Sequence, residues 1–244
     1  MRLRGAVLLA LFAIAGCQRP APEDDRPATA REFPRADRPV SALGGNSFST
    51  EDLRDSVGEA QVVMDLAAIK EGTTVADIGA GDGYYTVRLA ARVGAKGRVL
   101  AQDIDPAAYQ RLGQRVLRER LDNVSIRLGA ADDPKLPDAS FDRIFLVHMY
   151  HEVSEPYSFL WRMRPALRVG GQVIVVDIDR STGEHGIPPA LLFCEFGAAG
   201  FRLEEFVRKP ELRGYYAQFE AAGERPAPSA IKPCRMANGK TGTR

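Results

Sequence analysis

The chain has 244 residues, 45% of them hydrophobic, and its 33 basic and 32 acidic residues leave a formal net charge of +1. This balance gives no excess of positive charge that would attract nucleic acid, so we expect no nucleic-acid partner. The length is enough for one sizeable α/β domain with tails.

The first seventeen residues, MRLRGAVLLALFAIAGC, combine a basic front, a short apolar run and small residues before a cysteine. This pattern is typical of a signal peptide over residues 1–16, because the run is short for a membrane-spanning helix. The last four residues resemble the bacterial lipoprotein processing box, which implies that Cys17 is lipidated and anchors the protein to a membrane, facing the periplasm. Gln18 argues against retention at the inner membrane, leaving the outer membrane as a destination. The alternative is a cytoplasmic enzyme with an uncleaved N-terminal anchor.

Two segments flank the predicted domain. Residues 17–44 are polar and rich in proline, and we expect a linker that does not fold back as core. Residues 224–244 are rich in proline and glycine and predict a flexible tail. The domain itself is expected over residues 45–223.

The two remaining cysteines, Cys194 and Cys234, have no metal-ligand spacing between them. These cysteines either form a disulfide, if the protein works in an oxidising compartment, or are two free thiols. We favour free thiols.

The domain begins with a predicted helix. Ser49 and Asp52 have the spacing of a capping box, and Gly72 is expected to end the helix. The apolar residues that recur at helical intervals are Leu53, Val57, Ala60, Met64 and Ala67.

Strand-like and helix-like segments alternate from there on. The predicted strands are TVADIG, RVLAQDI, VSIRLG, FDRIFLVHM and QVIVVDI, with helical segments between most of them. Alternating βα units of this kind predict a Rossmann-like, doubly wound α/β fold with a mostly parallel sheet covered on both faces.

The most informative stretch is VADIGAGDGYYTVRLA, where an apolar strand runs into Gly79, Gly81 and Gly83 and then directly into a helix. Glycines here let backbone amides and a helix N-terminus approach a ligand. The spacing does not fit the dinucleotide fingerprint, because Tyr84 follows Gly83 and the third glycine falls one place early. No G-K-S/T pair for a triphosphate is present.

A second anchor lies at the end of the next strand. Asp103, in VLAQDIDP, follows the glycines by some 20 residues, where an acidic side chain can accept hydrogen bonds from both ribose hydroxyls of a nucleoside. Ile104, which follows it, is expected in the same site.

With Asp77 two residues before the first glycine, the turn resembles the D-x-G-x-G-x-G signature of class I S-adenosylmethionine-dependent methyltransferases. LRVGGQVIVVDID and AAGF also resemble segments of that family, and the resemblance covers roughly residues 50–222. The chain is similar in particular to exported bacterial methyltransferase-like lipoproteins. These have a YHH-like pair after strand four, which corresponds here to Tyr150-His151-Glu152.

The resemblance implies a seven-stranded sheet in which Tyr215–Ala221 is an antiparallel last strand between the fifth and sixth. It implies S-adenosyl-L-methionine as the cofactor, held by Asp77, the three glycines and Asp103. Tyr84 is expected at the methionine end of the cofactor, or else packed between helix and sheet, and His148 at the pocket wall. Two departures stand out, Val169 in place of a common proline and Ala130 in place of an aspartate that contacts adenine; Asp132 is the expected replacement.

Methyl transfer is an in-line displacement in which positioning and desolvation do most of the work, and a base is needed only where the acceptor is a hydroxyl or an ammonium. His151 is the candidate base, and Glu152 is expected to orient it. The alternative for each histidine is a ring bonded to neighbouring backbone. His185, on a loop that could cover the acceptor, is expected to be solvated.

Two functions therefore remain. One is a methyltransferase acting on an unidentified small-molecule acceptor; the other is a periplasmic binding module that keeps the nucleoside pocket without turnover. The cofactor is made in the cytoplasm, whereas the N-terminal segment points outside it.

Overall fold

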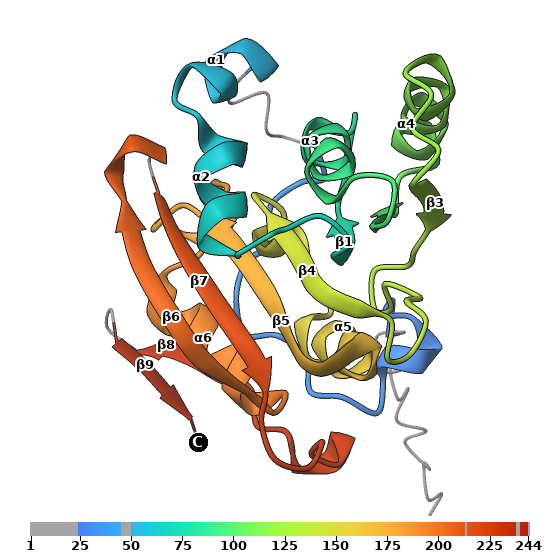
Figure 1. Cartoon of the computed structure of the whole chain (residues 1–244). Helices are drawn as coiled ribbons and strands as arrows, with labels where there is room; N and C mark the ends of the chain where they lie inside the picture. Colours follow the sequence, from blue (N-terminus) through green and yellow to red (C-terminus); the bar gives the residue numbers. More distant parts are fainter. Residues whose placement is uncertain (1–23, 45–49, 213, 238–239, 244) are drawn as a thin grey trace, which may run out of the picture.

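A seven-stranded sheet forms the centre of the protein, with strand order β3-β2-β1-β4-β5-β7-β6 (Figure 1). The structure is a computed structural model that describes residues 24–44, 50–212, 214–237 and 240–243. The strands of this sheet are β1 (Thr74–Ile78), β2 (Arg98–Asp103), β3 (Val124–Leu128), β4 (Phe141–Val147), β5 (Leu167–Asp177), β6 (Phe201–Lys209) and β7 (Gly214–Ala221). Strand β7 lies between β5 and β6 and runs in the opposite direction to the other six strands of this sheet. The predicted doubly wound fold and the inserted last strand are confirmed.

Helices cover both faces of this sheet. The helices are α1 (Glu51–Ser56), α2 (Glu59–Leu66), α3 (Tyr84–Val93), α4 (Pro106–Arg118), α5 (Pro156–Met163) and α6 (Pro189–Ala198). Apolar residues of α2 and α3 pack on one face, and those of α5 and α6 pack on the other. The central strands are therefore buried on both sides, which is why β1, β4 and β5 read as nearly continuous apolar runs.

The helix predicted near residue 50 is broken in two. Gly58, at φ +64°, lies between α1 and α2, so the apolar spacing continues but the helix does not. The predicted cap Ser49 lies outside the described residues. The N-cap is Thr50, whose hydroxyl accepts a hydrogen bond from the Leu53 amide.

Residues 24–44 do not behave as the expected linker, because they pack against the domain. Ala30 and Phe33 are buried. Arg26 forms an ion pair with Glu155 at the start of α5 (2.6 Å), and Arg38 forms one with Glu195 in α6 (2.8 Å). In Figure 1 this segment is the dark blue chain that runs beside α5. The segment is attached by buried arginines more than by apolar residues, so its polar composition gave no sign of the packing.

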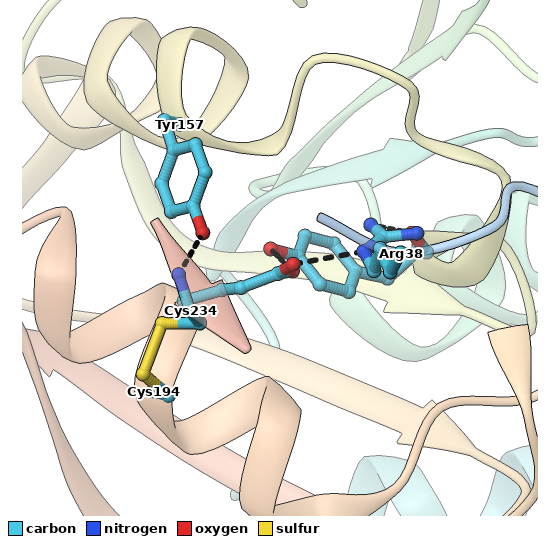
Figure 2. Close-up of a disulfide and its surroundings, with 6 residues drawn as sticks. Arg38, Tyr157, Cys194 and Cys234 are labelled. Carbon is cyan, nitrogen blue, oxygen red and sulfur yellow. Dashed lines mark hydrogen bonds and ion pairs between the residues drawn. A yellow bond between two sulfur atoms is a disulfide. The ribbon is translucent and has the colours of Figure 1, made fainter. Parts of the chain in front are cut away.

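The expected tail is also packed over its described part. Ile231 and Cys234 are buried, and β8 (Cys234–Ala237) pairs with β9 (Lys240–Thr243). Cys194 in α6 and Cys234 form a disulfide, so the interpretation as free thiols was wrong (Figure 2). The Cys234 amide also donates to the Tyr157 hydroxyl in α5, which fastens β8 to two helices.

Candidate active site

The loop between β1 and α3 holds the three predicted glycines, all with positive φ. A methyl group on Gly79 would lie 2.9 Å from the Met149 side chain, and one on Gly83 would lie 2.7 Å from Leu112, so packing requires glycine at both positions. A methyl group on Gly81 would meet no atom within 4 Å. Gly81 is thus the position at which the loop leaves space for a ligand.

Asp103 lies beside this loop, at the end of β2. One oxygen of its carboxylate accepts a hydrogen bond from the Gly81 amide (2.8 Å), and the other accepts one from the Asp105 amide (2.9 Å). Ile104 follows at the same strand end and is half-buried. The structure therefore brings together Gly81, Asp103 and Ile104, as the sequence predicted for a nucleoside site.

Asp77 lies near the end of β1, directly before the glycine loop. It is buried and accepts a hydrogen bond from the Thr86 hydroxyl in α3 (2.6 Å). Burial raises the pKa of Asp77 to about 6, although the hydrogen bond from Thr86 acts in the opposite direction. Asp77 thus joins β1 to α3 across the glycine turn.

Asp132, predicted as the adenine contact, is bonded to two other parts of the chain. Its buried carboxylate accepts hydrogen bonds from Thr29 (2.6 Å) and Arg162 (2.7 Å), so it attaches the N-terminal segment to α5. Sequence reasoning missed Gln102, which is buried near the end of β2. Its Nε2 has no hydrogen-bond partner among the described residues, and a methyl group on Gly129 would overlap it. Gln102 is a buried donor that a bound adenine could satisfy.

Tyr84 has a structural role, in contrast to the cofactor contact we expected. Its ring lies between the guanidinium groups of Arg54 and Arg88, each 3.8 Å from the ring centroid. Its hydroxyl donates to Asp55 in α1 (2.9 Å). The Tyr84 ring therefore joins α1 to α3 through these contacts.

His148 lies at the end of β4, on the side of α2. Its backbone has φ +52°, its amide donates to the Val176 carbonyl, and its Nε2 is 3.5 Å from a Glu59 oxygen. Burial favours the neutral form of Glu59, but hydrogen bonds and charges from His148 and Arg54 outweigh it and lower the Glu59 pKa to about 2. His148 is thus held by α2 at the edge of the site.

His151 is oriented by a residue that the sequence analysis did not assign. Its Nδ1 lies 3.0 and 2.9 Å from the two oxygens of Asp177, at the end of β5, and both side chains are almost fully buried. Asp177, and not Glu152, is therefore the residue that orients the ring. An acidic residue at the end of the strand in QVIVVDI was the available signal.

Glu152 and His185 lie on the other side of the His151 ring. Glu152 Oε1 is 3.9 Å from His151 Nε2, and the His185 ring meets the His151 ring edge-on at a centroid distance of 5.6 Å. Burial raises the pKa of Glu152, and the negative charges of Asp103 and Asp177 add to the effect. His185 is therefore part of the site and not the solvated loop residue we expected.

The geometry fits a nucleoside ligand. An open glycine position, a carboxylate braced beside it and a buried amide lie along the ends of β1 and β2, and the histidine cluster follows the ends of β4 and β5. Ligands of open α/β sheets bind at these carboxyl ends.

Comparison with known proteins agrees with this geometry. Residues 75–171 match the family model described as a methyltransferase domain. The chain is 31% identical over 119 residues to the ubiquinone/menaquinone biosynthesis C-methyltransferase UbiE of Idiomarina loihiensis, covering 48% of this chain and 47% of that protein. It also superposes on a SAM-dependent methyltransferase from Aquifex aeolicus with a TM-score of 0.61 and 26% identity, over 68% of this chain and 90% of that one.

Residues 75–171 form a methyltransferase domain, and the fold and the relatives support a class I S-adenosylmethionine-dependent methyltransferase. These comparisons support S-adenosylmethionine as the cofactor of this methyltransferase. The chain spans about half the length of the curated relatives it matches, among them an arsenite methyltransferase of Halobacterium salinarum (26% identity, 64% of this chain, 44% of that protein).

Proposed function

We propose that this protein transfers a methyl group from S-adenosylmethionine to a small molecule whose nucleophilic atom carries a proton. When bound, the cofactor supplies a methyl carbon that bonds to the acceptor atom while the carbon–sulfur bond breaks, its electron pair stays on sulfur and S-adenosylhomocysteine leaves. The observation that carries the proposal is the His151–Asp177 pair, which lies at the same edge of the sheet as the glycine loop. An acceptor that needed only positioning would have no use for such a pair.

The residues divide the work between two ends of the site. At the cofactor end, Asp103 holds the Gly81 amide and accepts hydrogen bonds from the ribose. At the acceptor end, Asp177 lies against Nδ1 of His151, and Nε2 lies on the side of Glu152. We assign the ring proton to Nδ1, where the carboxylate can accept it, so that Nε2 is the atom that removes the acceptor proton.

The relatives are named for several kinds of methyl acceptor. Some are C-methyltransferases of quinone biosynthesis, and one is an arsenite methyltransferase. These likenesses are low in identity and cover about half of the chain, so they support methyl transfer and not a particular acceptor.

The test uses two valine substitutions at open glycines with positive φ. Gly81→Val should abolish S-adenosylmethionine binding in calorimetry, because the side chain enters the space left for the ligand. Gly170→Val, at the other end of β5 from Asp177, is the matched control: it has φ +75° and equally open surroundings, so it carries a similar strain of roughly 1–3 kcal/mol and should leave binding unchanged.

Turnover then separates an enzyme from a binding module. His151→Ala should keep cofactor binding and lower formation of S-adenosylhomocysteine by about 100-fold, the usual scale for a lost acid–base group. If the wild type binds the cofactor but forms no S-adenosylhomocysteine with a panel of phenols, quinols and arsenite, the binding-module function replaces the enzymatic one. If Gly81→Val and Gly170→Val lose binding equally, the loss comes from backbone strain, and the proposal that the cofactor lies against Gly81 is contradicted.

We further propose that the protein is an exported lipoprotein anchored through Cys17, which lies outside the described residues. The Cys194–Cys234 disulfide supports this location, because disulfides persist in oxidising compartments. Within the described ranges no helix is long and apolar enough to cross a membrane. Radiolabelled palmitate should enter the wild type and not Cys17→Ala; labelling that survives this substitution would favour the uncleaved anchor.

A further inference from the structure

Two imidazoles and one carboxylate converge at the acceptor end of the site. A ring nitrogen of His151, a ring nitrogen of His185 and a carboxylate oxygen of Glu152 all lie within 4.8 Å of one another. Ligand atoms around one Zn²⁺ at about 2.1 Å lie roughly 3.3 Å apart in a tetrahedral arrangement, so small rotations of these side chains suffice to close the set. Two histidines and one carboxylate are a common ligand set for divalent transition metals.

Asp177 gives His151 the orientation of a metal ligand. Metal-binding histidines almost always donate their other ring N–H to a carboxylate or carbonyl, which directs the lone pair of the remaining nitrogen at the metal. In this protein an Asp177 oxygen lies 2.9 Å from Nδ1, and the opposite nitrogen, Nε2, is the one nearest Glu152. The His151 side chain is 1% exposed, so this orientation is fixed by packing as well.

A short segment of the N-terminal region contacts all three residues. The Ser41 hydroxyl accepts a hydrogen bond from the His185 amide (3.0 Å), and the Ser41 amide donates to the His151 carbonyl (3.5 Å). The Gly44 amide donates to Glu152 Oε2 (3.4 Å). Residues 41–44 therefore fix the backbone of both histidines and one oxygen of the Glu152 side chain, which limits how far the three residues can move apart.

We propose that His151, Glu152 and His185 bind one divalent transition-metal ion at the acceptor end of the site. The inference rests on the proposed function, because it places the ion beside the same acceptor; when the ion is bound, His151 coordinates it and does not take the acceptor proton itself. The ion would orient an acceptor oxygen and make its proton easier to lose to solvent. Zn²⁺, Fe²⁺ and Mn²⁺ are the ions that suit two imidazoles and one carboxylate.

The test is calorimetry of Zn²⁺ binding to the full chain after treatment with a chelator. We expect one Zn²⁺ per chain, and Co²⁺ at the same site should give visible absorption bands that report nitrogen and oxygen ligands. Glu152→Gln and His185→Ala should each weaken Zn²⁺ binding by roughly 100-fold or more, since loss of supporting residues alone costs 10- to 100-fold.

Glu184→Gln is the matched control, because Glu184 is an exposed acid beside His185 and outside the cluster. It should bind Zn²⁺ like the wild type. Binding that fails to saturate at one ion, or that Glu152→Gln and Glu184→Gln weaken equally, would overturn the proposal. Glu152→Gln keeps the shape of the side chain, and circular dichroism checks that each variant is folded.

The failure of this inference can be told apart from failure of the proposed function. S-adenosylmethionine binding to the chelated protein depends on the glycine loop and Asp103 and should persist without metal. If Zn²⁺ does not bind but S-adenosylhomocysteine is formed, only the metal site is wrong. If Zn²⁺ binds but S-adenosylmethionine does not, the proposed function is wrong and the metal site remains.

Discussion

The Asp103 carboxylate accepts a hydrogen bond from the Gly81 amide. We expect the same carboxylate to bind the ribose of the cofactor. Asp103→Ala should weaken S-adenosylmethionine binding by about 1.5–3 kcal/mol, the range for hydrogen bonds to a charged group, which is roughly 10- to 150-fold in the dissociation constant. Calorimetry measures the change.

Asp82→Ala is the control for this substitution. Asp82 lies in the same loop, but its carboxylate is exposed and pairs with an exposed Arg111. Its removal should leave binding almost unchanged. An Asp103→Ala protein that is folded and binds like the wild type would place the ribose elsewhere.

Asp77 should make stability depend on pH in an unusual direction. Its pKa in the folded protein is raised to about 6, above the ordinary value of 3.8, because burial disfavours the charge. The stabilisation is complete below pH 4 and is lost as the pH rises through 6, since the folded protein binds this proton more tightly than the unfolded chain does.

Asp77→Asn removes that proton equilibrium and retains an acceptor for the Thr86 hydroxyl. Relative to the wild type, the free energy of unfolding of Asp77→Asn should therefore increase between pH 4 and pH 7.5, on the order of 2 kcal/mol. Urea denaturation at several pH values measures this. A difference between the two proteins that is constant with pH would mean that Asp77 is ionised in the folded state throughout.

The N-terminal segment is the element whose attachment matters most to the site. Arg38 is almost fully buried and pairs with Glu195, which also accepts a hydrogen bond from the Tyr150 hydroxyl. Arg38→Met would leave the Glu195 charge buried without its cation, so we expect a loss of about 3–5 kcal/mol in the free energy of unfolding. Chemical denaturation measures the loss.

Arg208→Met is the comparison, because Arg208 and Asp179 form an exposed ion pair. Its cost should stay below about 1 kcal/mol. If Arg38→Met and Arg208→Met cost the same, the segment is held by its apolar residues and not by the buried ion pair.

At the scale of the whole molecule, the disulfide closes a long stretch of chain. Cys194 and Cys234 are 40 residues apart, and the bond joins α6 to β8, whose first amide is bonded to Tyr157 in α5 (Figure 2). Replacing both cysteines by serine should lower the free energy of unfolding by about 2–4 kcal/mol, mainly because the unfolded chain gains freedom.

A reductant provides the control for this prediction. Reducing agent should lower the unfolding midpoint of the wild type to that of the double serine variant and should not change the variant itself. A wild type that is insensitive to reductant while the double variant is destabilised would mean that the serines disturb packing and that the disulfide contributes little.

The Asp177 partner of His151 shows why the sequence did not predict all of the site. His151 was found because it follows an apolar strand, but its partner Asp177 belongs to another strand. The two meet because β4 and β5 pair in parallel with Val147 opposite Val176, so their carboxyl ends lie side by side. A sequence shows that each strand ends in a polar residue, but not which strands are neighbours or what their register is.

The sequence alone determined the β1–loop–α3 unit, Asp103 and the alternating fold, because these depend on local spacing, glycine and hydrophobic period. Only the tertiary structure decided the role of Tyr84, the place of His185, the disulfide and the packing of residues 24–44. These depend on partners far along the chain, such as Arg26 with Glu155, 129 residues apart. Buried arginines and acids look like solvated surface in a sequence, and only the folded neighbours turn them into the contacts that hold the site together.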